Sequence, residues 1–211
     1  MISTENFCKR LKIIDPNIKK FIEITLEDLK KHKIKLRIES KPVYGTYKLD
    51  GYFDDVEKKI AFRKQKDWLE TYVHEYCHFL QWKTKHPSFL AYYKHGFNAI
   101  EIVENWLDYE IEYSPKVSKS FDIIRSNEYH CERLAVKTIL EHSLPIDLEA
   151  YVRRSNRYFL FYHCVQKTRN WTPKTDFYNE KFLKSLPKTL SKRYVRKISE
   201  KMSDKLLPYF S

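Results

Sequence analysis

The sequence is poor in glycine and has no long apolar run. Only three glycines occur among 211 residues, which argues against a glycine-rich phosphate loop, a dinucleotide-binding fold or a barrel with many tight turns. No apolar window approaches the roughly 20 residues that a membrane span needs, and the first ten residues lack the apolar core of a signal peptide. We therefore expect long helices in a protein without a membrane segment.

Paired cysteines are missing as well. The four cysteines are scattered along the chain: Cys8, Cys77, Cys131 and Cys164. This spacing fits neither a disulfide framework nor a zinc knuckle. We expect a reduced, cytoplasmic protein.

Positive charge is in excess, with 40 Lys and Arg against 28 Asp and Glu and a net charge of +12. Such an excess can attract nucleic acid or an acidic partner. The excess is densest in residues 181–205, which contain nine basic residues and only two acidic ones, Glu200 and Asp204. Aromatic residues do not alternate with these charges as a base-stacking surface requires, so a solvated helical face is the favoured interpretation and nucleic-acid binding the alternative.

Hydrophobic periodicity predicts a helix and a small sheet in the first third of the chain. The spacing of apolar residues favours a helix over 17–32. Alternation then predicts strands at 34–38, 43–49 and 58–63. The last two strands would be joined through Gly51 and the acidic turn Asp54–Asp55.

From Asp67 onward the pattern is almost wholly helical. Asp67 and Glu70 match a capping box at the start of a helix. The pattern predicts helices over 67–85, 88–113, 117–142 and 146–170. One or two weaker helices are expected after Pro173. The predicted class is α+β, as a single domain over 1–211: a helix and sheet in 1–66, a helical bundle in 67–170 and a basic helical extension in 171–211.

One motif on the predicted helix 67–85 carries chemistry. His74 and His78 are four residues apart, so both imidazoles project from one helix face, about 5–6 Å apart at Cβ, and can bind one Zn²⁺. Glu75 follows the first histidine and can act as a base on a water that the metal polarises. Thr71, the uncharged neighbours and Leu80 match the longer form of this H-E-x-x-H pattern. The sequence therefore predicts a hydrolytic zinc site.

The motif resembles that of the zincin metallopeptidases. Gln81 and Thr84 stand where the metzincin branch has glycine and a third histidine, so that branch is excluded. Residues 127–137 instead resemble the second motif of the gluzincin branch. The chain also resembles small soluble phage-encoded metallopeptidase-like proteins. The gluzincin resemblance implies that Glu128 is the third metal ligand and that Glu132 supports a zinc-bound histidine. The two roles could be exchanged.

Other residues are weaker candidates for roles in the site. Glu101 and Glu104 are outside candidates for the third ligand. An oxyanion donor is expected from the helix 146–170, where the candidates are Tyr158, Tyr162 and His163. Cys77 and Cys131 are interpreted as small core residues, and His130 as a neighbour of Glu128.

The resemblance implies a zincin-like fold and a zinc metallopeptidase that hydrolyses a protein or peptide. Zincins commonly bind the substrate as a strand added to a sheet edge, and residues 58–63 are the expected edge. Two other functions stay open. One is a basic nucleic-acid-associated protein with a structural or vestigial metal site. The other is a peptidase scaffold retained as an inhibitor or binding module.

Overall fold

The computed structural model describes residues 3–44, 47–96 and 98–210. The chain forms two compact units. Unit 1 comprises Met1–Thr84 and Leu134–Ile146, and unit 2 comprises Lys85–Arg133 and Asp147–Ser211. One helix, α6 (Pro115–Glu141), belongs to both units, since its last turns are part of unit 1. No helix among the described residues is long and apolar enough to cross a membrane.

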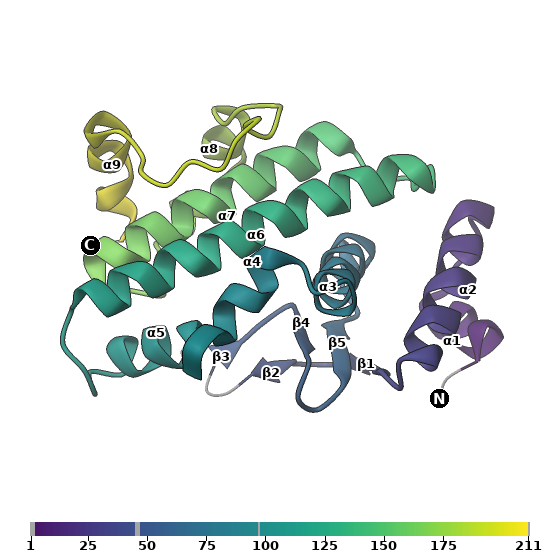
Figure 1. Ribbon diagram of the computed structural model, residues 1–211. Helices are drawn as coiled ribbons and strands as arrows, with labels where there is room; N and C mark the ends of the chain where they lie inside the picture. Colours follow the sequence, from purple (N-terminus) through teal and green to yellow (C-terminus); the bar gives the residue numbers. More distant parts are fainter. Residues whose placement is uncertain (1–2, 45–46, 97, 211) are drawn as a thin grey trace. The chain divides into compact units, whose positions relative to one another are not determined.

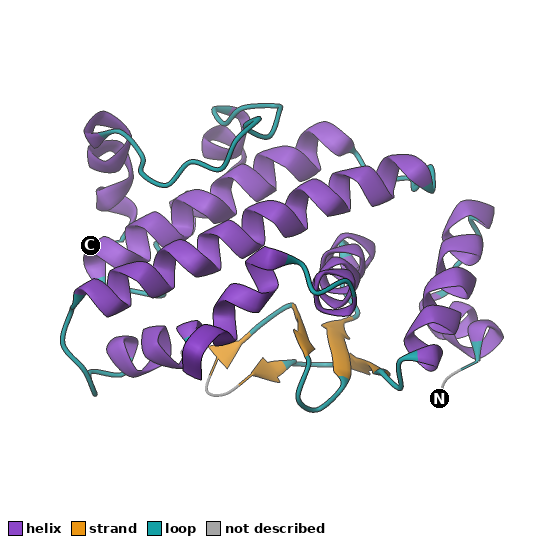
Figure 2. Cartoon of the chain, viewed as in Figure 1, coloured by secondary structure: helices purple, strands orange, loops and turns teal. Residues whose placement is uncertain are grey.

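Unit 1 combines helices with a small sheet (Figures 1 and 2). Its described elements before α6 are, in chain order, α1 (Thr4–Leu11), α2 (Pro16–Lys31), β1 (Lys35–Glu39), β2 (Val43–Tyr44), β3 (Tyr47–Lys48), β4 (Gly51–Asp54), β5 (Lys59–Arg63) and α3 (Trp68–Lys83). The three-stranded sheet has the order β1-β5-β4, with β1 parallel and β4 antiparallel to β5. Strands β2 and β3 form a separate antiparallel pair.

Helix α3 lies on the sheet at β4 and β5 (Figure 1) and is buried over most of its circumference. Its fully buried Tyr72 packs with Phe7, Phe21 and Phe62, whose ring centroids lie 5.5–6.0 Å away. The Tyr72 hydroxyl is satisfied by Thr25 Oγ1 of α2 at 2.7 Å. Such a helix is apolar on nearly every side because it forms the centre of the unit 1 core.

Gly51 brings β4 close to the helix that carries the H-E-x-x-H motif. An ideal Cβ at this position would lie 2.5 Å from Thr71 Cγ2, 3.1 Å from Glu75 Cγ and 3.1 Å from the Ala61 carbonyl oxygen. The strand therefore approaches α3 as closely as a backbone without a side chain allows. Glycine at this position lets β4 contact Glu75.

Gly51→Ala should destabilise the protein by about 1–3 kcal/mol, because the added methyl group overpacks this contact. Thr71→Ser removes the methyl group at 2.5 Å. In the double variant it should therefore recover part of the loss. Urea unfolding of the wild type, both single variants and the double variant measures this coupling. Strictly additive effects would show that the close approach does not limit packing here.

Unit 2 is helical in its described part (Figures 1 and 2). Its elements besides α6 are α4 (Pro87–Leu90), the 3₁₀ helix η1 (Ala91–Gly96), α5 (Ala99–Leu107), α7 (Leu148–Thr168), the 3₁₀ helix η2 (Thr175–Tyr178), α8 (Glu180–Lys184), α9 (Glu200–Leu206) and the 3₁₀ helix η3 (Leu207–Tyr209). Helices α6 and α7 run side by side and antiparallel: Arg125 Nη1 bonds Gln166 Oε1 at 2.6 Å, and Tyr151 bonds Glu132 at 2.6 Å.

The predicted α+β class is confirmed, as are the helices expected over 17–32, 67–85, 117–142 and 146–170. Their ends follow local capping chemistry. Asp15 and Asp147 accept backbone hydrogen bonds at the starts of α2 and α7. The capping box is wrong, however, because the Asp67 side chain makes no cap hydrogen bond; only its carbonyl bonds the first turn of α3.

The single helix expected over 88–113 is wrong. Asn98 caps a new helix by accepting from the backbone N–H of Glu101, so α5 starts separately from α4 and η1. At its other end α5 stops before Tyr109, which has a left-handed backbone (φ 64°). Position 97 of the predicted helix lies outside the described residues.

The predicted strand pattern is correct for two strands and wrong between them. β1 and β5 match 34–38 and 58–63. The strand expected over 43–49 is instead the β2–β3 pair, of which residues 45–46 lie outside the described part. Gly51–Asp54 was expected to be a connection and is strand β4. As a result β5 is the central strand, paired on both sides, and cannot be the free edge expected for 58–63.

Two further differences concern the chain ends. Helix α1 was not predicted, and it is capped by Ser3, whose side chain accepts from Asn6 N. The extension 171–211 is only partly helical, because residues 185–199 between α8 and α9 contain neither helix nor strand (Figure 2). We call residues 185–199 the strap.

Candidate metal centre

The two motif histidines converge on one point at the surface of α3. His74 and His78 are one helical turn apart, and their Nε2 atoms lie 3.0 Å from each other. Their rings are nearly perpendicular, with centroids 4.7 Å apart. Two imidazole nitrogens bound to one tetrahedral zinc at 2.0–2.1 Å would lie about 3.3 Å apart. The pair therefore needs only a small adjustment to hold a metal ion.

Gln81 orients His78 from the other side of its ring. The Gln81 Oε1 carbonyl lies 2.9 Å from His78 Nδ1, and both side chains are buried. Since a carbonyl oxygen only accepts, Nδ1 carries the proton and the Nε2 lone pair is directed at His74. A metal-binding histidine usually has such a partner on its second nitrogen.

Gln81 was not among the predicted site residues. From the sequence, Gln81 serves only to exclude the metzincin branch, which has glycine at this position. Its position three residues after His78 on a helix is a usable signal, because side chains at that spacing share a face.

Gln81→Leu should weaken zinc affinity about 10–100-fold, since the buried Nδ1–H loses its acceptor and the ring its fixed orientation. Gln81→Glu keeps an acceptor and should stay close to wild type. Competition with a fluorescent zinc chelator measures both affinities. Equal affinities for the leucine variant and the wild type would rule out the orienting role.

Glu75 is buried, with 6% of its surface exposed, and its Cγ faces Gly51 of β4. Glu75 follows His74 directly on α3. It is therefore adjacent to the histidine pair, but its side chain leaves the helix in a different direction. Burial beside β4 restricts the side chain to few conformations. A carboxylate held in this way is suited to act as a base.

In unit 2, the α6 residue Glu132 is fixed by two hydroxyl groups of α7. Its Oε2 atom accepts hydrogen bonds from the Tyr151 hydroxyl at 2.6 Å and from Ser155 Oγ at 2.8 Å. The carboxylate is 5% exposed. Two hydroxyl donors on one oxygen hold the carboxylate in one orientation, as a group that supports a metal-bound histidine requires.

Glu128, one turn before Glu132, lies in the same interior. Its negative charge, Tyr162 and Cys131 raise the pKa of the Tyr92 phenol well above its ordinary value, in addition to the larger effect of burial. Asn127 Nδ2 bonds the Tyr92 hydroxyl at 3.0 Å and thereby holds the ring in place. Glu128, Cys131 and Tyr162 thus all lie in the surroundings of Tyr92 within unit 2.

The three candidate oxyanion donors, Tyr158, Tyr162 and His163, all lie on α7 but have different surroundings. The Tyr162 hydroxyl is 2.9 Å from that of Tyr158, and Tyr162 lies on the side of Glu128. His163 instead lines a cavity with Tyr194 and Val195. Neighbouring residues on a helix are about 100° apart. Tyr162 is therefore the candidate that shares the surroundings of Glu128.

The other acidic candidates for the third ligand lie on α5, and His130 lies on α6. Glu101 is exposed on α5. Glu104 is half-buried, and burial followed by the charges of Asp108 and Glu101 raises its pKa. The His130 ring packs against His86, 5.0 Å between centroids.

Both predicted core cysteines are fully buried. Cys77 Sγ lies 3.7 Å from Thr138 Oγ1 inside unit 1. Cys131 lies on α6 in unit 2, three residues after Glu128.

Comparison with known proteins yields little. No family model matches the chain, and no solved structure matches it. A stretch of 36 residues, 17% of the chain, is 42% identical to a protein of Bacillus subtilis (strain 168) named "Putative antitoxin YutD". The chain spans 40% of that protein's length.

Proposed function

We propose that the chain is a zinc metallopeptidase of the gluzincin type with a zincin-like fold. The observation that carries the proposal is the convergence of two imidazole nitrogens on α3, with Gln81 holding the protonated nitrogen of His78. A catalytic zinc needs a third protein ligand and an open fourth position. The third ligand has to come from outside α3.

Helix α6 supplies this ligand, because its last turns contact α3 inside unit 1. Thr138 of α6 lies beside Cys77, which stands between the two histidines on α3. With 3.6 residues per turn, Cys131 is about two turns before Thr138 on the same face of α6, and Glu128 is three residues before Cys131. This face therefore offers one carboxylate and one thiol.

Glu128 is the third ligand in this proposal, because two histidines and a glutamate are the ligand set of known zinc peptidases. Cys131 is the competing donor, since His74, His78 and Cys131 also make a set that could hold a metal ion. Glu132, fixed by Tyr151 and Ser155, supports a histidine of the site.

His74, His78 and Glu128 would hold the zinc ion, which would supply a Lewis acid that makes a water molecule reactive near neutral pH. Glu75 takes the proton of the attacking water and passes it to the departing amine. The Tyr162 hydroxyl donates toward the carbonyl oxygen as negative charge develops on it.

The substrate is a protein or peptide in extended conformation. Strand β4 forms one edge of the sheet, and Gly51 brings it against Glu75. A peptide that adds to β4 as a further strand places its backbone beside the general base.

Hydrolysis of a library of quenched fluorescent peptides by the zinc-loaded chain tests the proposal. Cleavage that stops on chelation and returns with zinc is the expected result. A metal-loaded chain that cleaves neither the library nor an unfolded protein would exclude a general peptidase.

A further inference from the structure

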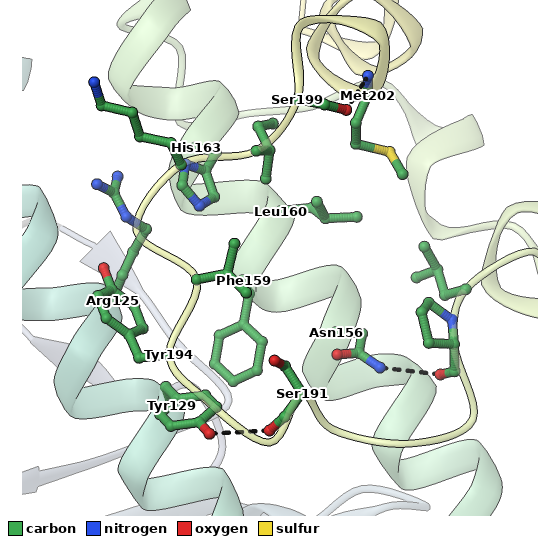
Figure 3. Close-up of a pocket in the computed structure, with 15 residues that line it drawn as sticks. Arg125, Tyr129, Asn156, Phe159, Leu160, His163, Ser191, Tyr194, Ser199 and Met202 are labelled. Atoms are coloured by element: carbon green, nitrogen blue, oxygen red, sulfur yellow. Dashed lines mark hydrogen bonds between the residues drawn. The ribbon is translucent and has the colours of Figure 1, made fainter.

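Unit 2 contains a cavity of about 340 Å³ between α6, α7 and the strap with the start of α9 (Figure 3). A volume above about 300 Å³ is in the range of small-molecule sites. The cavity is lined by Arg125, Tyr129, Asn156, Phe159, Leu160, His163, Leu186, Pro187, Ser191, Tyr194, Val195, Lys197, Ile198, Ser199 and Met202. None of these residues belongs to the proposed zinc site.

Most of the lining is apolar, and Phe159 and Leu160 lie in its middle (Figure 3). Arg125 and His163 lie near each other on one side of the cavity, and the labelled Asn156 and Ser191 lie away from them (Figure 3). Among the lining residues only Arg125 and Lys197 are charged at neutral pH, and none is acidic. An occupant would therefore meet an apolar body and a positively charged end.

Arg125 is a buried cation with an unused donor. Only 4% of its surface is exposed, and its Nε has no hydrogen-bond partner among the described residues. Asp122 Oδ1 is 4.0 Å from Arg125 Nη2. That carboxylate already accepts from the Tyr194 hydroxyl at 2.7 Å and pairs with Arg196 at 2.9 Å. The guanidinium is thus incompletely neutralised in the cavity wall.

His163 does not compensate this charge. Burial, followed by the nearby positive charges of Arg125 and Lys167, lowers its pKa to about 4, so the ring is neutral at pH 7. A buried donor without an acceptor costs free energy unless a ligand or water satisfies it. The missing partner at this end of the cavity is an anion.

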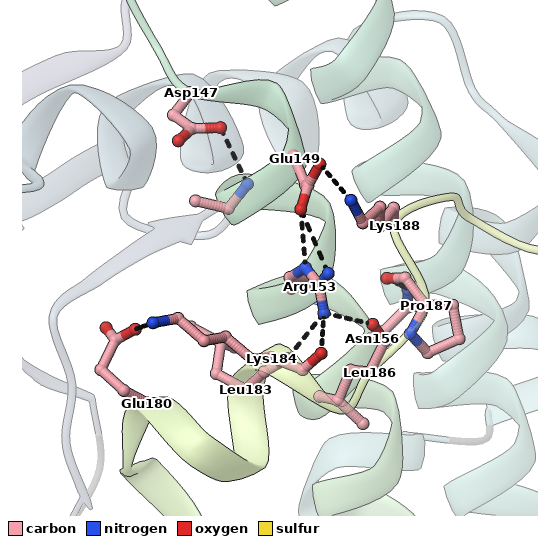
Figure 4. A network of polar contacts seen from close by, with 11 residues as sticks. Asp147, Glu149, Arg153, Asn156, Glu180, Leu183, Lys184, Leu186, Pro187 and Lys188 are labelled. Carbon is pink, nitrogen blue, oxygen red and sulfur yellow. Dashed lines mark hydrogen bonds and ion pairs between the residues drawn. The ribbon is translucent and has the colours of Figure 1, made fainter.

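The end of α8 and the start of the strap are held against α7 by hydrogen bonds and an ion pair. Arg153 of α7 donates to the carbonyl oxygens of Leu183, Lys184 and Leu186, and Glu149 pairs with Lys188 at 3.0 Å (Figure 4).

Further along the strap, Asn156 donates to the carbonyls of Pro187 and Thr189, and Tyr129 donates to that of Ser191. Loops as long as the strap without secondary structure are uncommon in compact domains and are usually functional. Held at these carbonyls, the strap forms one wall of the cavity and contributes side chains to its lining.

We propose that this cavity binds a small monocarboxylate with an apolar tail, such as a medium-chain fatty acid. The carboxylate pairs with the positively charged Arg125 side chain, and the tail packs among Phe159, Leu160 and Met202. A phosphate group fits less well, because it needs several donors and the lining offers few.

Calorimetric titration of the wild-type protein with hexanoate, octanoate, octanol and octylamine tests the proposal without any substitution. Octanoate should bind at least tenfold more tightly than octanol, which leaves the buried guanidinium unsatisfied, and octylamine should not bind. Affinity should rise about fourfold for each methylene from hexanoate to octanoate. Equal binding of octanol and octanoate, or no binding of either, would overturn the proposal.

Two variants locate the ligand. Met202→Trp fills the cavity and should abolish octanoate binding, and Arg125→Gln should reduce it at least tenfold. Arg193→Gln, on the exposed part of the strap, is the matched control and should bind as the wild type. Zinc content of all three should stay unchanged, so this result is separate from the proposed peptidase activity. Unaltered octanoate binding by Met202→Trp would place the ligand elsewhere.

Discussion

Replacing Glu75 with glutamine should abolish peptide hydrolysis while leaving one zinc per chain. Glutamine is nearly isosteric with glutamate and keeps the packing against Gly51, but it cannot accept the proton of the attacking water. Loss of a general base costs about 10²–10⁴-fold in rate. The measurement is the initial rate of cleavage of a fluorescent peptide at saturating substrate, together with zinc content of the same samples.

Glu27→Gln is the control for this substitution, since Glu27 is exposed on α2 and pairs with the equally exposed Lys31. It should retain full activity, because exposed pairs of this kind contribute little. Turnover by Glu75→Gln within a factor of a few of the wild type would refute the assigned mechanism. Loss of zinc together with activity would mean that Glu75 shapes the metal site.

The second large effect concerns the residue of α6 that completes the zinc site. Glu128→Ala should leave the protein unable to retain zinc through dialysis, because two imidazoles alone bind the metal weakly. Glu132→Ala should weaken zinc binding about 10–100-fold, as loss of a supporting carboxylate does.

Cys131→Ser keeps the size of the buried side chain while removing the thiol. It should retain zinc if Glu128 is the ligand. Loss of zinc in Cys131→Ser with full retention in Glu128→Ala would instead assign the site to two histidines and a cysteine. Metal analysis after dialysis, with circular dichroism to confirm folding, separates these outcomes.

The H-E-x-x-H helix could be predicted because its signal is local. A spacing of four residues on a helix determines that His74 and His78 share a face, and the apolar neighbours of the motif determine that the helix is buried. The structure has both features in α3. Helices α6 and α7 were predictable for the same reason, since each has a long periodic pattern.

Strand β4 and the role of Gly51 could not be predicted in this way. Four residues that begin with glycine make a weak strand signal. The pairing of β4 with β5 depends on contacts between the two segments. The hydrophobic periodicity of each segment alone does not reveal these contacts. Gln81 was missed for a related reason: its function depends on one side-chain conformation directed at His78 Nδ1.

The third ligand and the cavity depend on distant parts of the chain. Sequence resemblance selects Glu128, but helical periodicity within α6 does not reveal which other elements supply its neighbours. The cavity needs Arg125 of α6, Leu160 of α7 and the strap at once. The basic charge of the strap is partly accounted for by ion pairs such as Arg196 with Asp122. Nucleic-acid binding by this segment stays a prediction.

The most direct measurement for the central claim is the metal content of the purified wild-type chain beside His78→Ala. We expect one zinc per wild-type chain and none in His78→Ala, which removes one of the two converging imidazoles. A wild-type chain that binds no zinc after loading and dialysis would contradict the proposed metal site. So would a His78→Ala chain that binds zinc as tightly as the wild type.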